Sequence, residues 1–138
     1  EASAAALEEV EAVAVKVLKE LPVTPLSGIG VNFAFRAEAP TEALLDCFNL
    51  NDGAKLSASG PQILSTGITR AFDDDGNRIN YSMELGEDRS VTLKFNFHTP
   101  VSDGKEAISA IEKLSAVRLE RAEKIIGEVY ELSVEESE

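Results

Sequence analysis

Two residues of this chain are suited to covalent catalysis, the single cysteine Cys47 and the single histidine His98. A thiolate can attack a carbonyl carbon, and an imidazole can take the thiol proton when a carboxylate or amide orients it. No such motif surrounds Cys47, and its neighbours Leu44, Leu45 and Phe48 predict a buried thiol that packs as a small hydrophobic side chain. One histidine and one cysteine cannot complete a structural zinc site. We therefore expect no catalytic dyad, no metal centre and no cofactor.

The densest group of oxygen ligands is the run DDDGN at residues 73–77. Calcium loops supply oxygens at alternating positions and, in the EF-hand, a glutamate at the twelfth. Here Gly76 comes too early, and Glu84, at the right distance from Asp73, falls in a predicted strand. Asp and Asn stabilise turns through their side chains, and Gly tolerates positive φ. We predict a hairpin turn, with adventitious divalent-cation binding as the alternative.

Two glycines, Gly28 and Gly30, flank Ile29 as in part of a phosphate-binding loop. A third glycine and a strand followed directly by a helix are missing, and the dinucleotide-binding pattern requires both. Glycine inside a strand otherwise marks a bulge or a close approach of another group. We predict one of these two roles, a close approach to the backbone or a bulge, for this pair.

Polar residues that fall within predicted strands are the candidates for ligand binding. We select Arg36, Arg70, Asn80, Asn96 and His98. Arg70 shares its alternation with Ile68 and Phe72, which predicts either an edge position or a partly buried charge. That makes Arg70 the best single candidate for a functional polar residue, with a salt-bridged structural arginine as the alternative.

Alternation predicts a whole polar face of the sheet. Its expected members are Asn32, Arg36, Ser65, Thr69, Asn80, Ser82, Glu84, Thr92, Lys94, Asn96 and His98. Such a face is usually solvent-exposed sheet. The alternatives are a polar groove or an oligomer interface.

The elements that must position these residues follow from hydrophobic periodicity. Residues 4–21 predict an amphipathic helix, which Pro22 and Pro25 end because proline disfavours a helical residue before it. Val13, Val15 and Val17 also alternate, so a strand is the alternative there. Residues 26–38 switch to period two and predict a strand with one buried face.

The rest of the chain predicts a short helix at 42–48, a loop at 49–61, a three-stranded meander over 62–98 and a long helix from about 104 to 131. Ser102 or Asp103 is the expected N-cap of that helix. The fold class expected is α+β, with a single domain over residues 1–138. A four-stranded antiparallel sheet (strand, crossover, meander) is covered by the long C-terminal helix, and a further helix lies at the N-terminal end.

Composition restricts the partners. The chain has 138 residues and a formal net charge of −12, without a basic patch, so we expect neither nucleic acid nor an anionic membrane surface as partner. No apolar run approaches the roughly 20 residues that span a bilayer, and no signal-peptide pattern is present. A lone cysteine favours a reducing compartment, so we expect a cytoplasmic location.

One segment resembles a motif of uncharacterised bacterial proteins, in which a helix runs through a proline-bounded turn into a strand. The matching residues are Leu21, Pro22, Thr24, Pro25, Ile29, Gly30, Asn32 and Phe33. The predicted order of strand, crossover, meander and long helix is also similar to the SecB-like export-chaperone fold. This resemblance implies polypeptide binding but transfers no functional residue.

These observations favour a non-enzymatic protein-binding or assembly module, and the resemblance implies a chaperone-like one. We expect it to be a homo-oligomer that uses its sheet or strand edges to hold a polypeptide partner. The alternatives are a structural subunit of a larger assembly of phage or secretion type, and a small-ligand or enzyme site on the polar sheet face.

Overall fold

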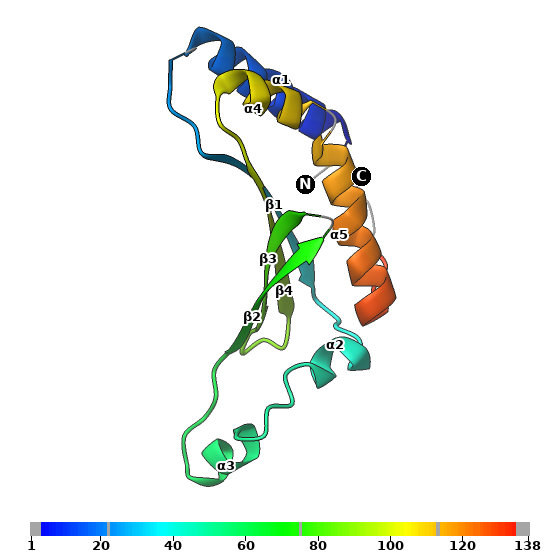
Figure 1. Ribbon diagram of the computed structural model, residues 1–138. Helices are drawn as coiled ribbons and strands as arrows, with labels where there is room; N and C mark the ends of the chain where they lie inside the picture. The colour runs from blue at the N-terminus through cyan, green and yellow to red at the C-terminus, as the bar shows by residue number, and fades with distance from the viewer. Residues whose placement is uncertain (1–3, 22, 75, 113, 135–138) are drawn as a thin grey trace.

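The computed structural model describes residues 4–21, 23–74, 76–112 and 114–134 (Figure 1). Helices and strands follow one another in the order α1 Ala4–Glu20, β1 Gly28–Ala37, α2 Glu42–Asp46, α3 Gly53–Ala58, β2 Thr66–Asp74, β3 Asn77–Leu85, β4 Val91–Pro100, α4 Gly104–Ile111 and α5 Leu114–Tyr130. None of the described helices combines the length and the apolar character that a membrane span requires. The architecture is α+β, as the periodicity predicts.

The four strands form one open antiparallel sheet in the order β1-β4-β3-β2. The meander β2-β3-β4 pairs through two hairpins. The crossover with α2 and α3 lets β1 pair with β4, so that Gly28 lies opposite Pro100 and Ala37 opposite Val91. β1 and β2 are therefore the edges of the sheet.

Apolar side chains fill one face of the sheet, which α5 covers (Figure 1). The strands contribute Phe33, Ile79, Tyr81, Met83, Val91, Leu93, Phe95 and Phe97, and the helices contribute Leu44, Ala122, Ile126 and Tyr130. Each large apolar side chain contributes about 1.5–3 kcal/mol when fully buried. The burial of this face therefore holds α5 on the sheet.

The remaining helices lie at the two ends of the sheet (Figure 1). α1 packs with α4 at the end where β1 begins and β4 stops. The short helices α2 and α3 lie at the other end, within the crossover. Among the described residues, no helix covers the other face of the sheet (Figure 1).

The C-terminal helix is divided into α4 and α5, whereas the periodicity predicts one continuous helix. Glu112, at the division, has ψ 116°, which is far from helical. α4 packs against α1 at the end of the sheet, and α5 lies along the apolar face, so one straight helix could not make both sets of contacts. Asp103 is the N-cap of α4, and its carboxylate accepts from the backbone N–H groups of Lys105 and Glu106 at 2.8 Å each.

The segment expected as a loop at 49–61 contains the exposed helix α3. Its sequence GAKLSA includes good helix formers between the glycine and serine residues on which the loop prediction rested. The backbone N–H of Leu56 donates to the carbonyl of Asp52 at 2.9 Å, which closes a full helical turn.

Candidate functional site

The face of the sheet opposite α5 carries small and polar side chains. The register aligns them in rows that cross the strands. One row is Asn32, Asn96, Asn80 and Ala71; the next is Ala34, Lys94, Ser82 and Thr69. We call this surface the outer face. It carries the polar set that the alternation predicts in the strands.

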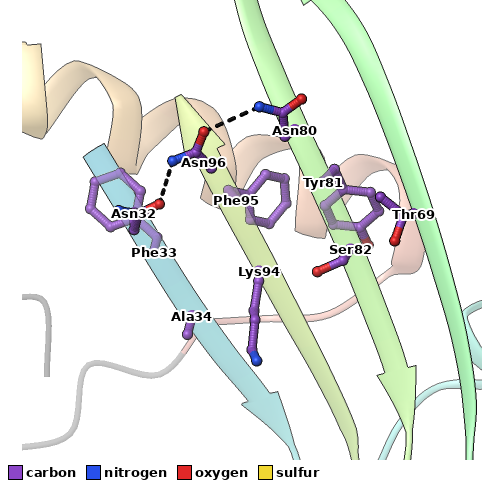
Figure 2. Close-up of a pocket in the computed structure, with 10 residues that line it drawn as sticks. All are labelled: Asn32, Phe33, Ala34, Thr69, Asn80, Tyr81, Ser82, Lys94, Phe95 and Asn96. Carbon is purple, nitrogen blue, oxygen red and sulfur yellow. Dashed lines mark hydrogen bonds between the residues drawn. The ribbon is translucent and has the colours of Figure 1, made fainter. Parts of the chain in front are cut away.

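A chain of side-chain hydrogen bonds crosses the outer face (Figure 2). Within β3, Arg78 Nε donates to Asn80 Oδ1 at 3.1 Å. Figure 2 shows the two bonds that continue toward β1, in which Asn80 Nδ2 donates to Asn96 Oδ1 at 3.2 Å and Asn96 Nδ2 donates to Asn32 Oδ1 at 2.5 Å. The chain ends at Asn32, whose amide N–H groups meet no acceptor in the part of the protein that the structure describes.

The asparagine row borders a hollow of about 510 Å³ on the outer face (Figure 2). Its polar lining comes from Asn32, Asn80, Asn96, Thr69, Ser82 and Lys94. Ala34 and the core residues Phe33, Tyr81 and Phe95 complete it. Amides, hydroxyls and one ammonium group can donate and accept hydrogen bonds, so the hollow is suited to a polar ligand or a peptide backbone.

Ser82 and Lys94 are cross-strand neighbours in this hollow. A serine–lysine pair can form a nucleophile and base when the two are hydrogen-bonded. No hydrogen bond joins them among the described residues, and the Lys94 side chain is exposed. The two side chains are therefore neighbours on the outer face without being joined as a nucleophile and base in this structure.

His98 lies on the same outer face, beside the glycines of β1. A Cβ at Gly28 would lie 2.4 Å from His98 Cε1, and a Cβ at Gly30 would lie 3.3 Å from Asn96 Nδ2. The glycines therefore make room for side chains of β4 to lie close to the backbone of β1, which is one of the two roles predicted for this pair. The register is unbroken at both glycines, so the alternative role, a bulge, is not the one that the structure has. His98 contributes packing over Gly28 rather than lining the hollow.

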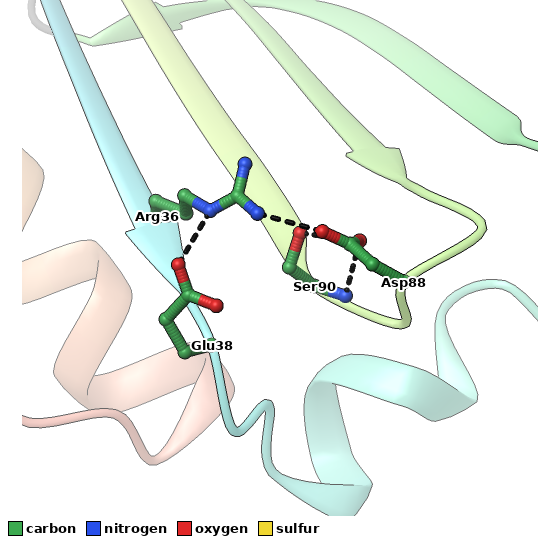
Figure 3. Close-up of polar contacts among 4 residues, drawn as sticks. All are labelled: Arg36, Glu38, Asp88 and Ser90. Carbon is green, nitrogen blue, oxygen red and sulfur yellow. Dashed lines mark hydrogen bonds and ion pairs between the residues drawn. The ribbon is translucent and has the colours of Figure 1, made fainter.

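Arg36 is held in a surface network away from the hollow (Figure 3). Its Nε donates to Glu38 Oε1 and its Nη2 to Asp88 Oδ2, both at 2.7 Å. Asp88 also accepts from the hydroxyl of Ser90 at 2.8 Å and from its backbone N–H at 3.0 Å. Its partner Glu38 raises the pKa of Arg36, and the hydrogen bonds from Ser90 lower the pKa of Asp88. This network ties the end of β1 to the β3–β4 turn.

Arg70 lies on the helix-covered side of the edge strand β2, opposite Tyr81 in the register, and its side chain is exposed. Of the five candidates, the structure brings together only Asn80 and Asn96. The candidate set leaves out four polar residues that share the hollow, namely Asn32, Thr69, Ser82 and Lys94. Strand alternation places all four on this face, but it cannot show that they converge.

Cys47 and His98 lie on opposite sides of the sheet. Cys47 packs against the helix-covered core, and its Sγ donates to the carbonyl of Ala43 at 3.5 Å. His98 lies on the outer face. The sheet separates the two, so they form no dyad.

The acidic run forms the hairpin turn that its composition predicts. Asp73 Oδ1 accepts from the backbone N–H of Gly76 at 2.9 Å, and Gly76 has φ +78°. Both carboxylate oxygens of Asp74 accept from Arg121 at 2.8 Å. Asp75 lies outside the described residues. Among the described residues no group of three His, Cys, Asp or Glu side chains is placed to hold a metal ion.

One hydrogen bond determines which backbone groups of β1 point outward. The backbone N–H of Val101 donates to the carbonyl of Ser27, so these two residues form a hydrogen-bonded pair just beyond the Gly28–Pro100 pair. Hydrogen-bonded and non-hydrogen-bonded pairs alternate along an antiparallel ladder, so Gly28 and every second residue after it in β1 belong to non-hydrogen-bonded pairs. The residues of β1 that direct their N–H and C=O groups away from β4 are Gly28, Gly30, Asn32, Ala34 and Arg36. They are also the residues on the outer face.

The same alternation of hydrogen-bonded and non-hydrogen-bonded pairs determines which backbone groups point outward at the other edge, β2. Gly86 N donates to Ser90 O at the β3–β4 turn, which places the outward-directed groups of β2 on Gly67, Thr69, Ala71 and Asp73. Within the described part of the chain, no strand pairs with the open side of β1 or of β2. Both edges therefore offer free backbone donors and acceptors.

The two edges differ in charge. β1 carries a single charged residue, Arg36, in ten, whereas β2 carries Arg70, Asp73 and Asp74 in nine. Charged side chains on an edge strand oppose pairing with another strand. β1 is therefore the less protected edge.

Comparison of the chain with protein-family models, with curated proteins and with solved structures finds no match.

Proposed function

We propose that this protein is a non-enzymatic module that binds polypeptide and holds an extended segment along the open edge of β1. The observation that carries the proposal is the ten-residue edge of β1, which presents free backbone groups and one charged side chain. A peptide that adds to such an edge gains main-chain hydrogen bonds at alternate residues. A chaperone-like role, or a role in holding a partner within an assembly, follows from the same contact.

The outer face adds a polar determinant to this edge. Asn32 ends the asparagine chain, and its backbone groups also point to the open side of β1. A ligand strand paired with β1 would place one of its side chains beside Asn32 on the outer face. An amide or hydroxyl there would continue the chain of hydrogen bonds, so segments with Asn, Gln, Ser or Thr at that position should be preferred.

Proline substitution at the two edges tests the proposal. Ala34 and Ala71 are both exposed, both lie on the outer face, and both direct their N–H groups outward. Proline at either position removes an outward donor but no hydrogen bond within the sheet. The probe is fluorescently labelled, reduced and carboxymethylated α-lactalbumin, which stays unfolded, with binding followed by fluorescence anisotropy.

We expect Ala34→Pro to weaken binding about tenfold, because it removes a main-chain hydrogen bond and obstructs the edge. Ala71→Pro is the matched control and should bind like the unmodified protein. Ala34→Lys and Ala71→Lys repeat the comparison without a backbone change, since an edge lysine also opposes strand addition. Equal affinity of the folded Ala34 and Ala71 variants would exclude the β1 edge, and no binding by the unmodified chain would reject polypeptide binding.

The hollow on the outer face favours a second candidate function, the binding of a small polar ligand. Its volume of about 510 Å³ lies in the range of ligand pockets, and its polar groups come from three strands. A panel of amino acids and sugars screened by ligand-observed NMR tests this function. Binding of a small ligand that Lys94→Ala and Asn96→Ala abolish would favour the second function over the first.

A further inference from the structure

One side of helix α1 packs against other elements of the same chain. Leu7 packs against the core, and Glu11 Oε1 accepts from the backbone N–H of Ser115 in α5 at 2.9 Å. Ala14 and Leu18 continue this side and are half-buried. The spacing of 7, 11, 14 and 18 is that of one helical seam, and α4 and α5 cover it.

A second apolar stripe on α1 faces solvent. Val10 is 65% exposed, Val13 58% and Val17 49%, and Leu21, just beyond the end of the helix, is 51% exposed. Positions 10, 13, 17 and 21 recur every three or four residues, so they form one line along the helix. Single exposed apolar residues are ordinary in soluble proteins, but a continuous line of them marks an interaction surface.

Charges of opposite sign flank this stripe one heptad apart. Glu9 precedes Val10, and Lys16 precedes Val17. At 100° per residue both lie on the same border of the stripe, on the side away from the covered seam. Glu20 precedes Leu21 on the same border, so the border carries Glu9 in the first half of the helix and Lys16 followed by Glu20 in the second half.

We propose that α1 pairs in antiparallel orientation with α1 of a second copy of this chain. Full overlap of the two helices places a two-fold axis near residue 12 and sets Val10 of each copy against Val13 of the other. The same register brings Glu9 of each copy opposite Lys16 of the other. The surface is thus complementary to itself, as a two-fold interface requires.

Charge selects this orientation over the parallel one. In parallel pairing, Glu9 would lie level with Glu9 and Lys16 with Lys16, without attraction between opposite charges. If the antiparallel helices were shifted by one heptad toward their C-terminal ends, Lys16 of one copy would lie close to Lys16 of the other copy. Only the full antiparallel overlap places Glu9 of each copy opposite Lys16 of the other copy.

The stripe is short, so the dimer should be weak, with its population rising between roughly 1 µM and 1 mM protein. Sedimentation equilibrium of the full chain at about 0.15 M salt measures this. Val10→Gln with Val13→Gln should remove the dimer, because both are exposed and glutamine keeps helix propensity. Circular dichroism checks that these variants remain folded.

A charge exchange tests the orientation. Lys16→Glu sets two pairs of like charges at the interface and should weaken the dimer about tenfold. Adding Glu9→Lys to that variant should restore the affinity to within about threefold. Lys19→Glu makes the same change of net charge on the far side of the helix, so it is the matched control and should have little effect.

A chain that stays monomeric at 1 mM would overturn the proposal. So would a dimer that survives both glutamine substitutions, or one in which Lys16→Glu and Lys19→Glu act equally. The inference goes beyond the proposed function, because the stripe lies on α1 and the peptide site on the open edge of β1. Failure of one test leaves the outcome of the other unchanged, since Ala34→Pro acts on peptide binding and Lys16→Glu on self-association.

Discussion

Neighbouring residues of β4 show how different the two faces of the sheet are. Phe95 is 1% exposed and packs beneath α5 beside Tyr81, whereas Asn96 is half-buried and joins a chain of amides on the outer face. The backbone is the same, and only the direction of the side chain differs. One face supplies most of the buried apolar surface that stabilises the fold, and the other carries the polar side chains on which the proposed binding depends.

The helix-covered face has one feature that does not serve stability. The hydroxyl of Tyr81 is buried and has no hydrogen-bond partner among the described residues. Burial raises the pKa of this hydroxyl, so it stays protonated. The outer face, in contrast, joins its asparagines through hydrogen bonds, and its polar atoms also reach water.

The largest difference between the faces should appear in a pair of alanine substitutions. Phe95→Ala should lower the free energy of unfolding by about 3–5 kcal/mol, because it opens a cavity in the core. Asn96→Ala, one residue away, should cost about 1 kcal/mol, the net contribution of one or two partly solvated hydrogen bonds. Urea unfolding at pH 7 measures both, and equal losses would contradict the assignment of stability to the covered face.

Tyr81→Phe should change the free energy of unfolding by less than Phe95→Ala does, and it should stabilise the protein rather than destabilise it. Removing a buried hydroxyl without a partner should raise the free energy of unfolding by about 1–2 kcal/mol. The ring contact with Tyr130, at a centroid distance of 6.2 Å, remains. Thermal and urea unfolding measure the change, and a loss of stability would show that the hydroxyl has a partner in solution.

Asp74→Asn should have the smallest effect. The pair that Asp74 forms with Arg121 joins the β2–β3 turn to α5, but the two side chains are 32% and 39% exposed, so the cost at pH 7 should stay below about 1 kcal/mol. Glu87→Gln, in the exposed β3–β4 turn, is the control.

The pH dependence of that pair has a defined sign. Hydrogen bonds from Arg121 lower the pKa of Asp74, so the contribution of the pair is present above the unfolded-state pKa of about 3.9. It is lost as the pH falls through the lower folded-state value. The difference between the unmodified chain and Asp74→Asn should therefore vanish near pH 2, and a difference that persists there would contradict the ionic origin.

Alternation in the sequence predicts the strands and their two faces because a strand directs successive side chains to opposite sides. Val91, Leu93, Phe95 and Phe97 are all buried, as their spacing requires. The hairpins follow from local turn chemistry, since the Asp73–Gly76 hydrogen bond closes within four residues. These features depend on neighbours along the chain.

Other features have weaker local signals. Arg118 lies four residues before Ala122 and eight before Ile126, which places it on the buried stripe of α5. It is 5% exposed, and its guanidinium donates to the hydroxyl of Thr99. Burial lowers its pKa. Helical spacing could have indicated this position, but only the packing of α5 on β4 supplies the partner.

The candidate site could be predicted only in part. The alternation of side chains along each strand is enough to assign Asn32, Asn80 and Asn96 to one face of the sheet and Arg70 to the other. It does not show that the three asparagines stand in a row, because that depends on how β1 pairs with β4 across a separation of 64 residues.

The sequence by itself determined the strands, their buried faces and the apolar side of the C-terminal helical region, because these depend on side-chain periods of two and 3.6 residues. For residues 4–21 it left helix and strand both open, and the structure has the helix α1. Tertiary structure decided the break between α4 and α5, the row of asparagines and the edges left open. Each of these depends on contacts between residues far apart in the chain. The difference between the two faces of the sheet is thus encoded locally, and what each face can bind is determined by the pairing of the strands.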